Sequence, residues 1–178
     1  MIRYSNKILS VLLFFSLFIS CSKDEPTDTN PIIEPELTFS VENLNGVSFD
    51  DNEVVSFNST EYPEASLDFL VRNISNEIIG MRIEVESISG TDGSMMELCF
   101  GQCFAGVSEG TSYPSNNAQP VVYINPGETQ PSNGDHFLNS DPGDGSNPVE
   151  YTFKFYSADE DGNIVGEPFR LKYRYSSN

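Results

Sequence analysis

The sequence predicts an all-β domain over residues 37–178, folded as an antiparallel β-sandwich of about seven to nine strands. Short runs alternate apolar and polar residues, turn-forming sequences such as "NPGE" and "DPGDG" separate these runs, and no long stretch keeps a helical period. Alternation with β-branched and aromatic residues is typical of half-buried strands. A chain of this size buries about two-thirds of its surface on folding, which is enough for one hydrophobic core.

Six runs carry the alternating pattern. The last two, 149–157 and 169–175, are predicted to form a hairpin across "ADEDGNIVGEP", a connection longer than a tight turn. In chain order, the six runs are "LTFSV" (37–41), "SLDFLVRN" (66–73), "MRIEVES" (81–87), "VVYI" (121–124), "VEYTFKFY" (149–156) and "FRLKYRY" (169–175).

The first twenty residues have the three parts of an export signal. Arg3 and Lys7 give a basic start, Ile8–Ile19 form an apolar run, and Ser20 is a small residue before the cut. A membrane-spanning helix needs about 20 apolar residues, whereas this run has 12. Residues 1–20 are therefore predicted to be a signal peptide.

The sequence "LFISC", which ends at Cys21, resembles the lipobox of bacterial lipoproteins in the relaxed form of Bacteroidota. The resemblance implies a lipid on Cys21, and the alternative is an ordinary secretory signal with an incidental cysteine. Residues 22–36 are rich in proline and acidic residues, so 21–36 is predicted to be a lipidated cysteine with a disordered acidic tether.

The start of this tether, "SKDE", resembles the surface-export signal of such lipoproteins. This second feature implies an outer-membrane lipoprotein exposed at the cell surface, anchored in the membrane through its lipid. A body that faces the periplasm is the alternative.

The charge of the chain excludes one class of partner. After removal of residues 1–20 the chain keeps all 27 acidic residues and seven of its nine basic ones, so its formal charge is −20. Nucleic-acid binding requires clustered Lys and Arg, and no nucleic-acid partner is expected. A well-solvated exported protein fits this composition.

Cys99 and Cys103 are predicted to form a disulfide, because an exported protein meets oxidising conditions. In an extended strand these residues would lie about 13 Å apart, while a disulfide requires Cα atoms within about 4.4–6.8 Å. The chain must therefore turn sharply, and Gly101 permits this. A redox site is the alternative, although the spacing is not C-x-x-C. Zinc is disfavoured because the chain has a single histidine.

The stretch from "LCFGQCF" through "YINPGETQP" to "SADEDGN" resembles a recurring extracellular immunoglobulin-like domain of Bacteroidota, over roughly residues 95–163. The resemblance implies an immunoglobulin-like sandwich without catalytic residues. The chain departs from the pattern before the first cysteine, where Met95, Met96 and Leu98 stand in place of a Trp.

Two acidic, glycine-containing loops offer oxygen ligands for calcium, although neither has the spacing of an EF-hand. The alternative is a plain turn, because turns also require Asp and Gly. Calcium is the only cofactor considered, and the candidate ligands are Asp141 and Asp144 in one loop and Asp159, Glu160, Asp161 and Asn163 in the other.

Three further groups of residues bear on function. The single histidine, His136, would be the base of a hydrolase, but no nucleophile motif accompanies it. Four basic residues share one face of the last two strands, where they either guard a sheet edge or form a docking patch for an acidic partner. Exposed tyrosines would serve as contacts for sugars. The basic residues are Lys154, Arg170, Lys172 and Arg174, and the tyrosines are Tyr62, Tyr113 and Tyr123.

The predicted function is that of a non-catalytic binding or adhesion module at the cell envelope, with an unknown protein or glycan as its ligand. The first alternative is a glycan-capture lipoprotein of a nutrient-uptake system. The second, from a different class, is a hydrolase built around His136.

Overall fold

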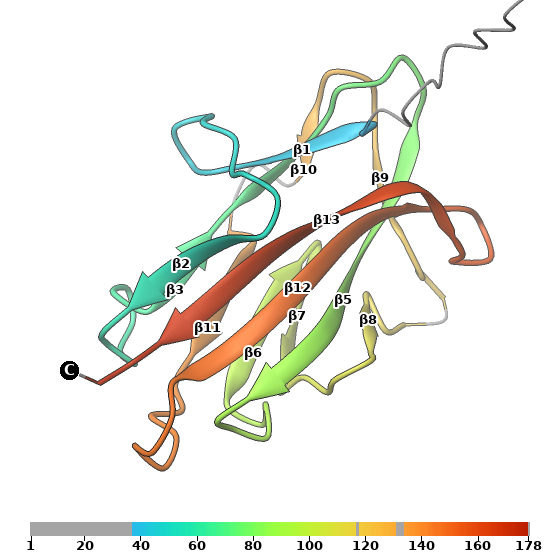
Figure 1. Ribbon diagram of the computed structural model, residues 1–178. Coiled ribbons are helices and arrows are strands. Elements are labelled where there is room, and N and C mark those ends of the chain that lie inside the picture. The colour runs from blue at the N-terminus through green and yellow to red at the C-terminus, as the bar shows by residue number, and fades with distance from the viewer. Residues whose placement is uncertain (1–36, 117, 131–133, 178) are drawn as a thin grey trace, which may run out of the picture. The chain divides into compact units, whose positions relative to one another are not determined.

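The computed structural model describes residues 37–116, 118–130 and 134–177, which contain thirteen β-strands and no helix (Figure 1). No helix of this part of the chain is therefore long and apolar enough to cross a membrane. The predicted signal peptide, the lipid on Cys21 and the tether 21–36 all lie outside the described residues.

The strands form three sheets. In spatial order, the three-stranded sheet contains β1 (Phe39–Glu42), β4 (Leu70–Asn73) and β10 (Thr129–Gln130), and the four-stranded sheet contains β3 (Ser66–Asp68), β11 (His136–Asn139), β6 (Met96–Phe100) and β7 (Gln102–Ala105). The six-stranded sheet contains β2 (Glu53–Phe57), β13 (Ile164–Tyr175), β12 (Val149–Ala158), β5 (Ile79–Ser89) and β8 (Ser112–Tyr113), with β9 (Val122–Ile124) also paired to β5.

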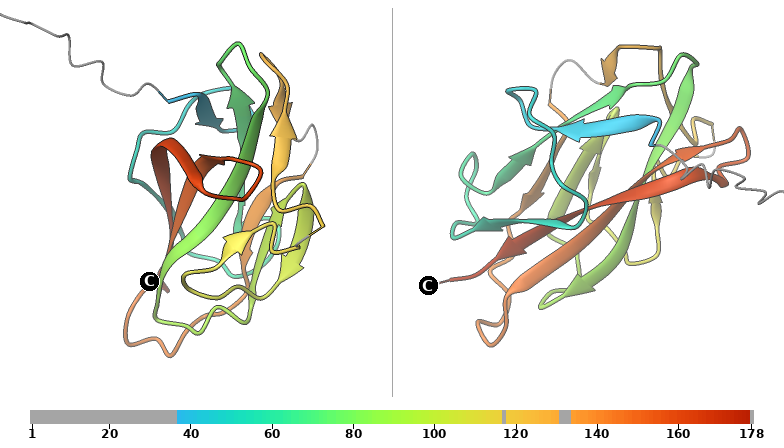
Figure 2. Two further views of the ribbon diagram at one scale, coloured as in Figure 1. Left: turned by 90° about the vertical axis from the view of Figure 1, so that its right-hand side faces the viewer. Right: turned by 45° about the horizontal axis from the view of Figure 1, so that its top comes forward.

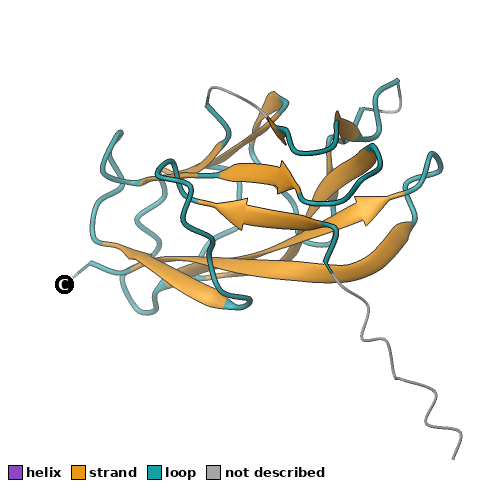
Figure 3. Cartoon of the chain, turned by 90° about the horizontal axis from the view of Figure 1, so that it is seen from above, coloured by secondary structure: helices purple, strands orange, loops and turns teal. Residues whose placement is uncertain are grey.

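The two smaller sheets pack against the six-stranded sheet, and the two layers face each other in Figures 2 and 3. Aromatic rings fill the space between them. Phe137 of β11 stacks on Phe153 of β12 with ring centroids 3.6 Å apart, and Phe69 meets Phe155 edge-to-face at 5.3 Å. All strand pairs are antiparallel except β2 with β13, which is parallel. The predicted all-β antiparallel sandwich is thus confirmed.

Alternation along the long strands places the side chains as predicted. In β12 the residues Val149, Tyr151, Phe153 and Phe155 are fully buried, while the residues between them are partly or fully exposed. β5 starts in the same way, with Met81, Ile83 and Val85 buried. Because side chains alternate between the faces of a strand, one face of the six-stranded sheet lies in the core and the other carries charge.

The structure corrects two details of the predicted strands. The run 66–73 is two strands, because the chain leaves the four-stranded sheet at Asp68 and enters the three-stranded sheet at Leu70. Fully buried Phe69 lies at the crossing. The smaller layer is therefore divided between two sheets that share one continuous segment.

The second correction concerns the β12–β13 hairpin, whose connection is 159–163 and not the longer "ADEDGNIVGEP". Gly166 and Pro168, which suggested a loop, lie inside β13. The register there moves from Phe155 opposite Phe169 to Ser157 opposite Val165, so the extra residues form a bulge in the strand. Thirteen strands in place of about seven to nine reflect several strands of two or three residues, which are too short to show a period.

Candidate functional site

The predicted disulfide joins Cys99 of β6 to Cys103 of β7, and it is confirmed. The two residues are directly opposite each other across the hairpin, with Cα atoms 3.9 Å apart. Gly101 makes the turn with a φ of +70°, and a Cβ at this position would lie 3.0 Å from a methyl group of Val122. The disulfide therefore fixes a hairpin within one sheet and does not link the two layers, as predicted.

Asp135 lies against the turn of this hairpin and was not predicted. The backbone N–H of Gly101 donates to Oδ1 of Asp135 over 2.9 Å, and the residue is only 3% exposed. Its Oδ2 is buried without a hydrogen-bond partner among the described residues. Burial raises the pKa of Asp135 to about 7, against the opposing effects of the Gly101 hydrogen bond and of His136.

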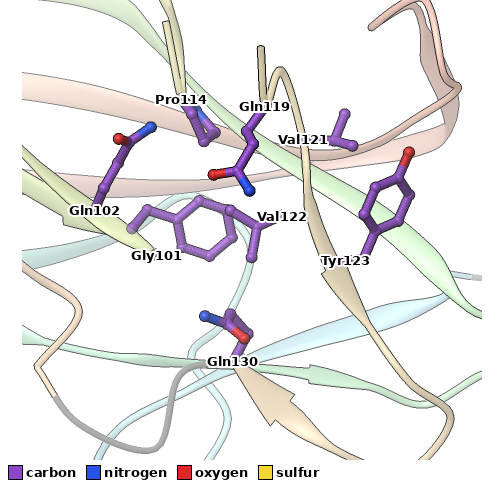
Figure 4. Close-up of a pocket in the computed structure, with 9 residues that line it drawn as sticks. Gly101, Gln102, Pro114, Gln119, Val121, Val122, Tyr123 and Gln130 are labelled. Atoms are coloured by element: carbon purple, nitrogen blue, oxygen red, sulfur yellow. The ribbon is translucent and has the colours of Figure 1, made fainter. Parts of the chain in front are cut away.

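A pocket of about 260 Å³ opens where the hairpin turn meets β9 and β10 (Figure 4). Its floor is apolar and its walls are polar but uncharged. The residues that line it are Phe100, Gly101, Gln102, Pro114, Gln119, Val121, Val122, Tyr123 and Gln130. We call this the glutamine pocket.

The glutamine pocket contains every glutamine of the chain, Gln102, Gln119 and Gln130. In Figure 4 the side chain of Gln119 enters from above and that of Gln130 from below, while Gln102 and Tyr123 lie at the two ends. Among the described residues these carboxamides have no side-chain hydrogen-bond partner. Sequence analysis did not single out these three residues. The only available signal was that glutamine is rare in this chain, with three in 178 residues.

Hydrogen bonds hold one wall of the glutamine pocket in place. Arg82 of β5 donates from Nη2 to the carbonyl oxygens of Ser112 and Pro114, over 3.2 and 3.1 Å. The hydroxyl of Tyr156 is 2.8 Å from that of Ser112 and donates to it. The six-stranded sheet thereby fixes the segment that leads from β8 to Pro114, so the wall is built on a rigid layer.

The three tyrosines predicted as sugar contacts do not form a cluster. Tyr113 is buried and packs edge-to-face on Phe104, with ring centroids 4.9 Å apart. Tyr62 is 72% exposed but lies in the connection between β2 and β3, away from the residues that line the pocket. Tyr123, which is 61% exposed, lines the glutamine pocket. One of the three tyrosines is therefore available to a ligand there.

The four basic residues predicted as a docking patch do share the outer face of the six-stranded sheet. Three of them are neutralised by acidic neighbours in a ladder of ion pairs. Lys154 lies 2.7 Å from Glu84, both Nε and Nη2 of Arg170 bind Glu86, and Arg174 lies 3.1 Å from Glu150. Of these four residues, only Lys172 forms no ion pair with another described residue. This charged ladder is not a free basic surface.

In the two acidic loops, several carboxylate oxygens accept local hydrogen bonds. Asp159 accepts from the backbone N–H groups of Asp161 and Asn163 and from the Asn163 amide. Asp141 accepts from Gly143 N–H and from the Thr91 hydroxyl, and Asp144 accepts from Ser146 N–H. The bonds from the N–H groups two residues further on, those of Asp161, Gly143 and Ser146, are the bonds of Asx turns. Calcium binding at either loop stays a prediction. If a loop binds calcium, the melting temperature of the protein should rise in millimolar calcium.

His136 lies on β11, with its ring partly buried. Its Nε2 is 2.9 Å from Oε1 of Glu97, and its Nδ1 is 2.8 Å from the carbonyl oxygen of Gly134. Both ring nitrogens thus face acceptors, and neither faces a hydroxyl that the imidazole could activate.

The one group of possible metal ligands among the described residues also contains His136, together with Glu97 and Cys99. The sulfur of Cys99 belongs to the disulfide, so it cannot bind a metal as a thiolate. Two ligands remain, which is fewer than a structural or catalytic zinc site uses. Glu97 and His136 thus form a hydrogen-bonded pair beside the disulfide.

No protein-family model matches the sequence, and a search of curated proteins finds no match. Solved structures with a similar fold include the N-terminal domain of PorA, at 14% identity and a TM-score of 0.44, covering 79% of this chain and 98% of that one. The seventh PapD-like domain of human CEP192 has 10% identity and a TM-score of 0.41, covering 81% and 87%. The CooA pilin subunit of enterotoxigenic Escherichia coli has 7% identity and a TM-score of 0.38, covering 80% and 99%. At these values the likeness says nothing of a ligand or a partner.

Proposed function

We propose that this protein is a non-catalytic binding module of the cell envelope and that the glutamine pocket is its binding site. The observation that carries the proposal is the gathering of all three glutamines of the chain, from three separate segments, around one pocket, where their carboxamides have no hydrogen-bond partner among the described residues. Binding sites typically combine an apolar floor with a few polar groups that orient the ligand. The disulfide and the Arg82 hydrogen bonds supply the rigidity that such a site needs.

The proposal includes the anchor predicted from the sequence. A lipid on Cys21 would hold the protein at the outer membrane, with the body facing the outside of the cell. The experiment is to express wild type and Cys21→Ala in a Bacteroidota host, then measure the mass, the membrane association and the protease sensitivity of whole cells. We expect the variant to lose its membrane association and its lipid mass. A variant with unchanged mass that stayed in the membrane would contradict the anchor.

The binding function is tested with the mature chain that carries Cys21→Ala, immobilised and exposed to envelope extracts and to a glycan array. We expect a retained ligand whose capture is weakened by Gln119→Ala, because this exposed residue lines the pocket. Asn45→Ala is the matched control, since Asn45 is an exposed carboxamide in the connection between β1 and β2. Equal capture by the two variants would remove the glutamine pocket as the binding site.

A further inference from the structure

The lining of the glutamine pocket restricts the charge of its ligand. None of the lining residues carries a charged side chain, in a chain with 27 acidic and nine basic residues. An anionic ligand would find no cation in the pocket and would meet the negative field of the whole protein. A cationic ligand would find no carboxylate in the lining to replace its water. The lining therefore suits an uncharged ligand.

The three carboxamides restrict the functional groups of that ligand. Each carboxamide has an oxygen that accepts and an NH₂ group that donates hydrogen bonds. A hydroxyl group also donates one bond and accepts others, so a carboxamide and a pair of neighbouring hydroxyls can exchange bonds in both directions. Gln102, Gln119 and Gln130 surround the pocket from different sides. A ligand with hydroxyls around its rim would satisfy all three.

The remaining lining residues supply an apolar surface. Phe100 and Val121 are buried side chains of the lining, while Tyr123, at one end, exposes 61% of its surface. An aromatic ring of this kind offers a large contact area with few rotatable bonds. The C–H faces of a sugar ring pack on such a surface while its hydroxyls point outward to polar groups. The volume, about 260 Å³, falls just below the range of roughly 300–1,000 Å³ of sites for drug-sized ligands.

Resting on the proposed binding function, we infer that the glutamine pocket binds a single residue of a neutral glycan. The sugar ring lies against Tyr123 and the apolar floor, and its hydroxyls exchange hydrogen bonds with Gln102, Gln119 and Gln130. The rest of the glycan lies outside the pocket. Because the lining of the pocket is uncharged, it selects neutral hexoses and N-acetylhexosamines over uronic and sialic acids.

The experiment is an array of neutral hexose and N-acetylhexosamine oligosaccharides beside uronic-acid and sialylated ones, probed with the mature chain that carries Cys21→Ala. The neutral oligosaccharide that binds best is then titrated calorimetrically. We expect binding to neutral members only, and an affinity that falls about tenfold or more in Gln119→Ala and in Gln130→Ala. Tyr123→Ala should cause a similar loss, because it removes the ring that a sugar packs against.

Two matched controls keep the test specific. Tyr62→Ala removes an exposed tyrosine outside the pocket, and Asn45→Ala removes an exposed carboxamide outside it. Neither should change the affinity for the neutral oligosaccharide. The melting temperature of each variant confirms folding, and Gln119→Glu, which keeps the shape but adds a charge, provides a second readout. It should weaken binding as the alanine variant does.

The outcomes separate the sugar from the binding function. Binding of acidic glycans alone, or neutral binding that the pocket variants leave unchanged, would overturn the inference. The inference would also be overturned if the protein captured an envelope protein through the pocket but bound no sugar on the array. In that case the proposed binding function would stand. If nothing were captured from either source, both would fail.

Discussion

The glutamine pocket and the charged ladder use polar side chains in opposite ways. On the outer face of the six-stranded sheet, Glu84, Glu86 and Glu150 each bind a cation of another strand. At the pocket, three carboxamides have no partner among the described residues, and Asp135 below them has one oxygen unpaired. Polar groups that satisfy one another have little left for a ligand. The difference is that the polar groups of the charged ladder are paired with one another, whereas the carboxamides of the proposed binding site are free of partners among the described residues.

The two regions also respond to pH with opposite signs. The pKa of Asp135 is raised because its carboxyl is buried, so folding disfavours its ionised form. The pKa of Glu86 is lowered, chiefly because Arg170 donates hydrogen bonds to the carboxylate. Asp135 therefore costs stability as the pH rises from about 4 to about 7, while Glu86 adds stability above its ordinary pKa of 4.5 and loses it below.

The largest effect is expected for Asp135→Asn. The amide oxygen keeps an acceptor for Gly101 N–H, and the variant cannot ionise, so it should be more stable than wild type above pH 7 by up to about 4 kcal/mol. The difference should shrink as the pH falls from about 7 to about 4. Urea unfolding of both proteins across pH 4–8 measures it. Asp144→Asn, at an exposed turn, is the control, and parallel pH profiles for wild type and Asp135→Asn would contradict the prediction.

The second effect concerns the hairpin. Replacing Cys99 and Cys103 together by serine removes a cross-link over a very short loop, which contributes about 2 kcal/mol by loop entropy. The melting temperature should fall by roughly 5–10 °C. Because the turn lines the pocket, ligand affinity should fall as well. Reduced wild-type protein should match the variant, and an unchanged affinity in both would show that the pocket does not depend on the cross-link.

A smaller effect is expected for Glu86→Gln on the charged ladder. The change removes a two-pronged ion pair with Arg170 that is about one-third exposed, so stability at pH 7 should fall by about 1 kcal/mol. Ligand binding should stay as in wild type. Glu64→Gln, at an exposed position between β2 and β3, is the control. If Glu86→Gln lost ligand binding, the charged ladder would contribute to binding as the glutamine pocket does, and this prediction would be wrong.

The smallest effect is expected for Arg174→Ala. Its ion pair with Glu150 has side chains that are 45% and 47% exposed, so solvent screens the attraction. The free energy of unfolding should change by less than about 0.5 kcal/mol, and raising the salt concentration should abolish the difference. A loss as large as that of Glu86→Gln would mean that the charged ladder acts as one network.

Much of the fold is predictable from local pattern. Alternation placed Phe153, Leu171 and Tyr173 in the core, and the structure buries all three. Gly101 between two cysteines predicted the disulfide turn. The pattern failed where tertiary contacts overrode it, as at Phe69, where one run is shared by two sheets, and at Gly166 and Pro168, which a bulge accommodates inside β13.

The candidate site was harder to predict, because residue type alone drew attention to charged and aromatic side chains. Four basic residues were predicted to share one face, as guards of a sheet edge or as a docking patch, and their position on one face was right: Lys154, Arg170, Lys172 and Arg174. The pairing of three of them with glutamates of β5 and β12 depends on strand order, which the sequence does not state. Asp135 has the composition of a surface turn residue, and only its burial below Gly101 shows otherwise.

By itself, the sequence determined what depends on neighbouring residues: the strands, most of the turns, the disulfide hairpin and the face on which each strand is apolar. These follow from the two-residue period of a strand and from the reach of a short chain. Only the tertiary structure decided which distant segments meet. Gln102, Gln119 and Gln130 come together because β7, the chain before β9, and β10 converge on one pocket. Contacts between separate strands and loops leave no local period in the sequence.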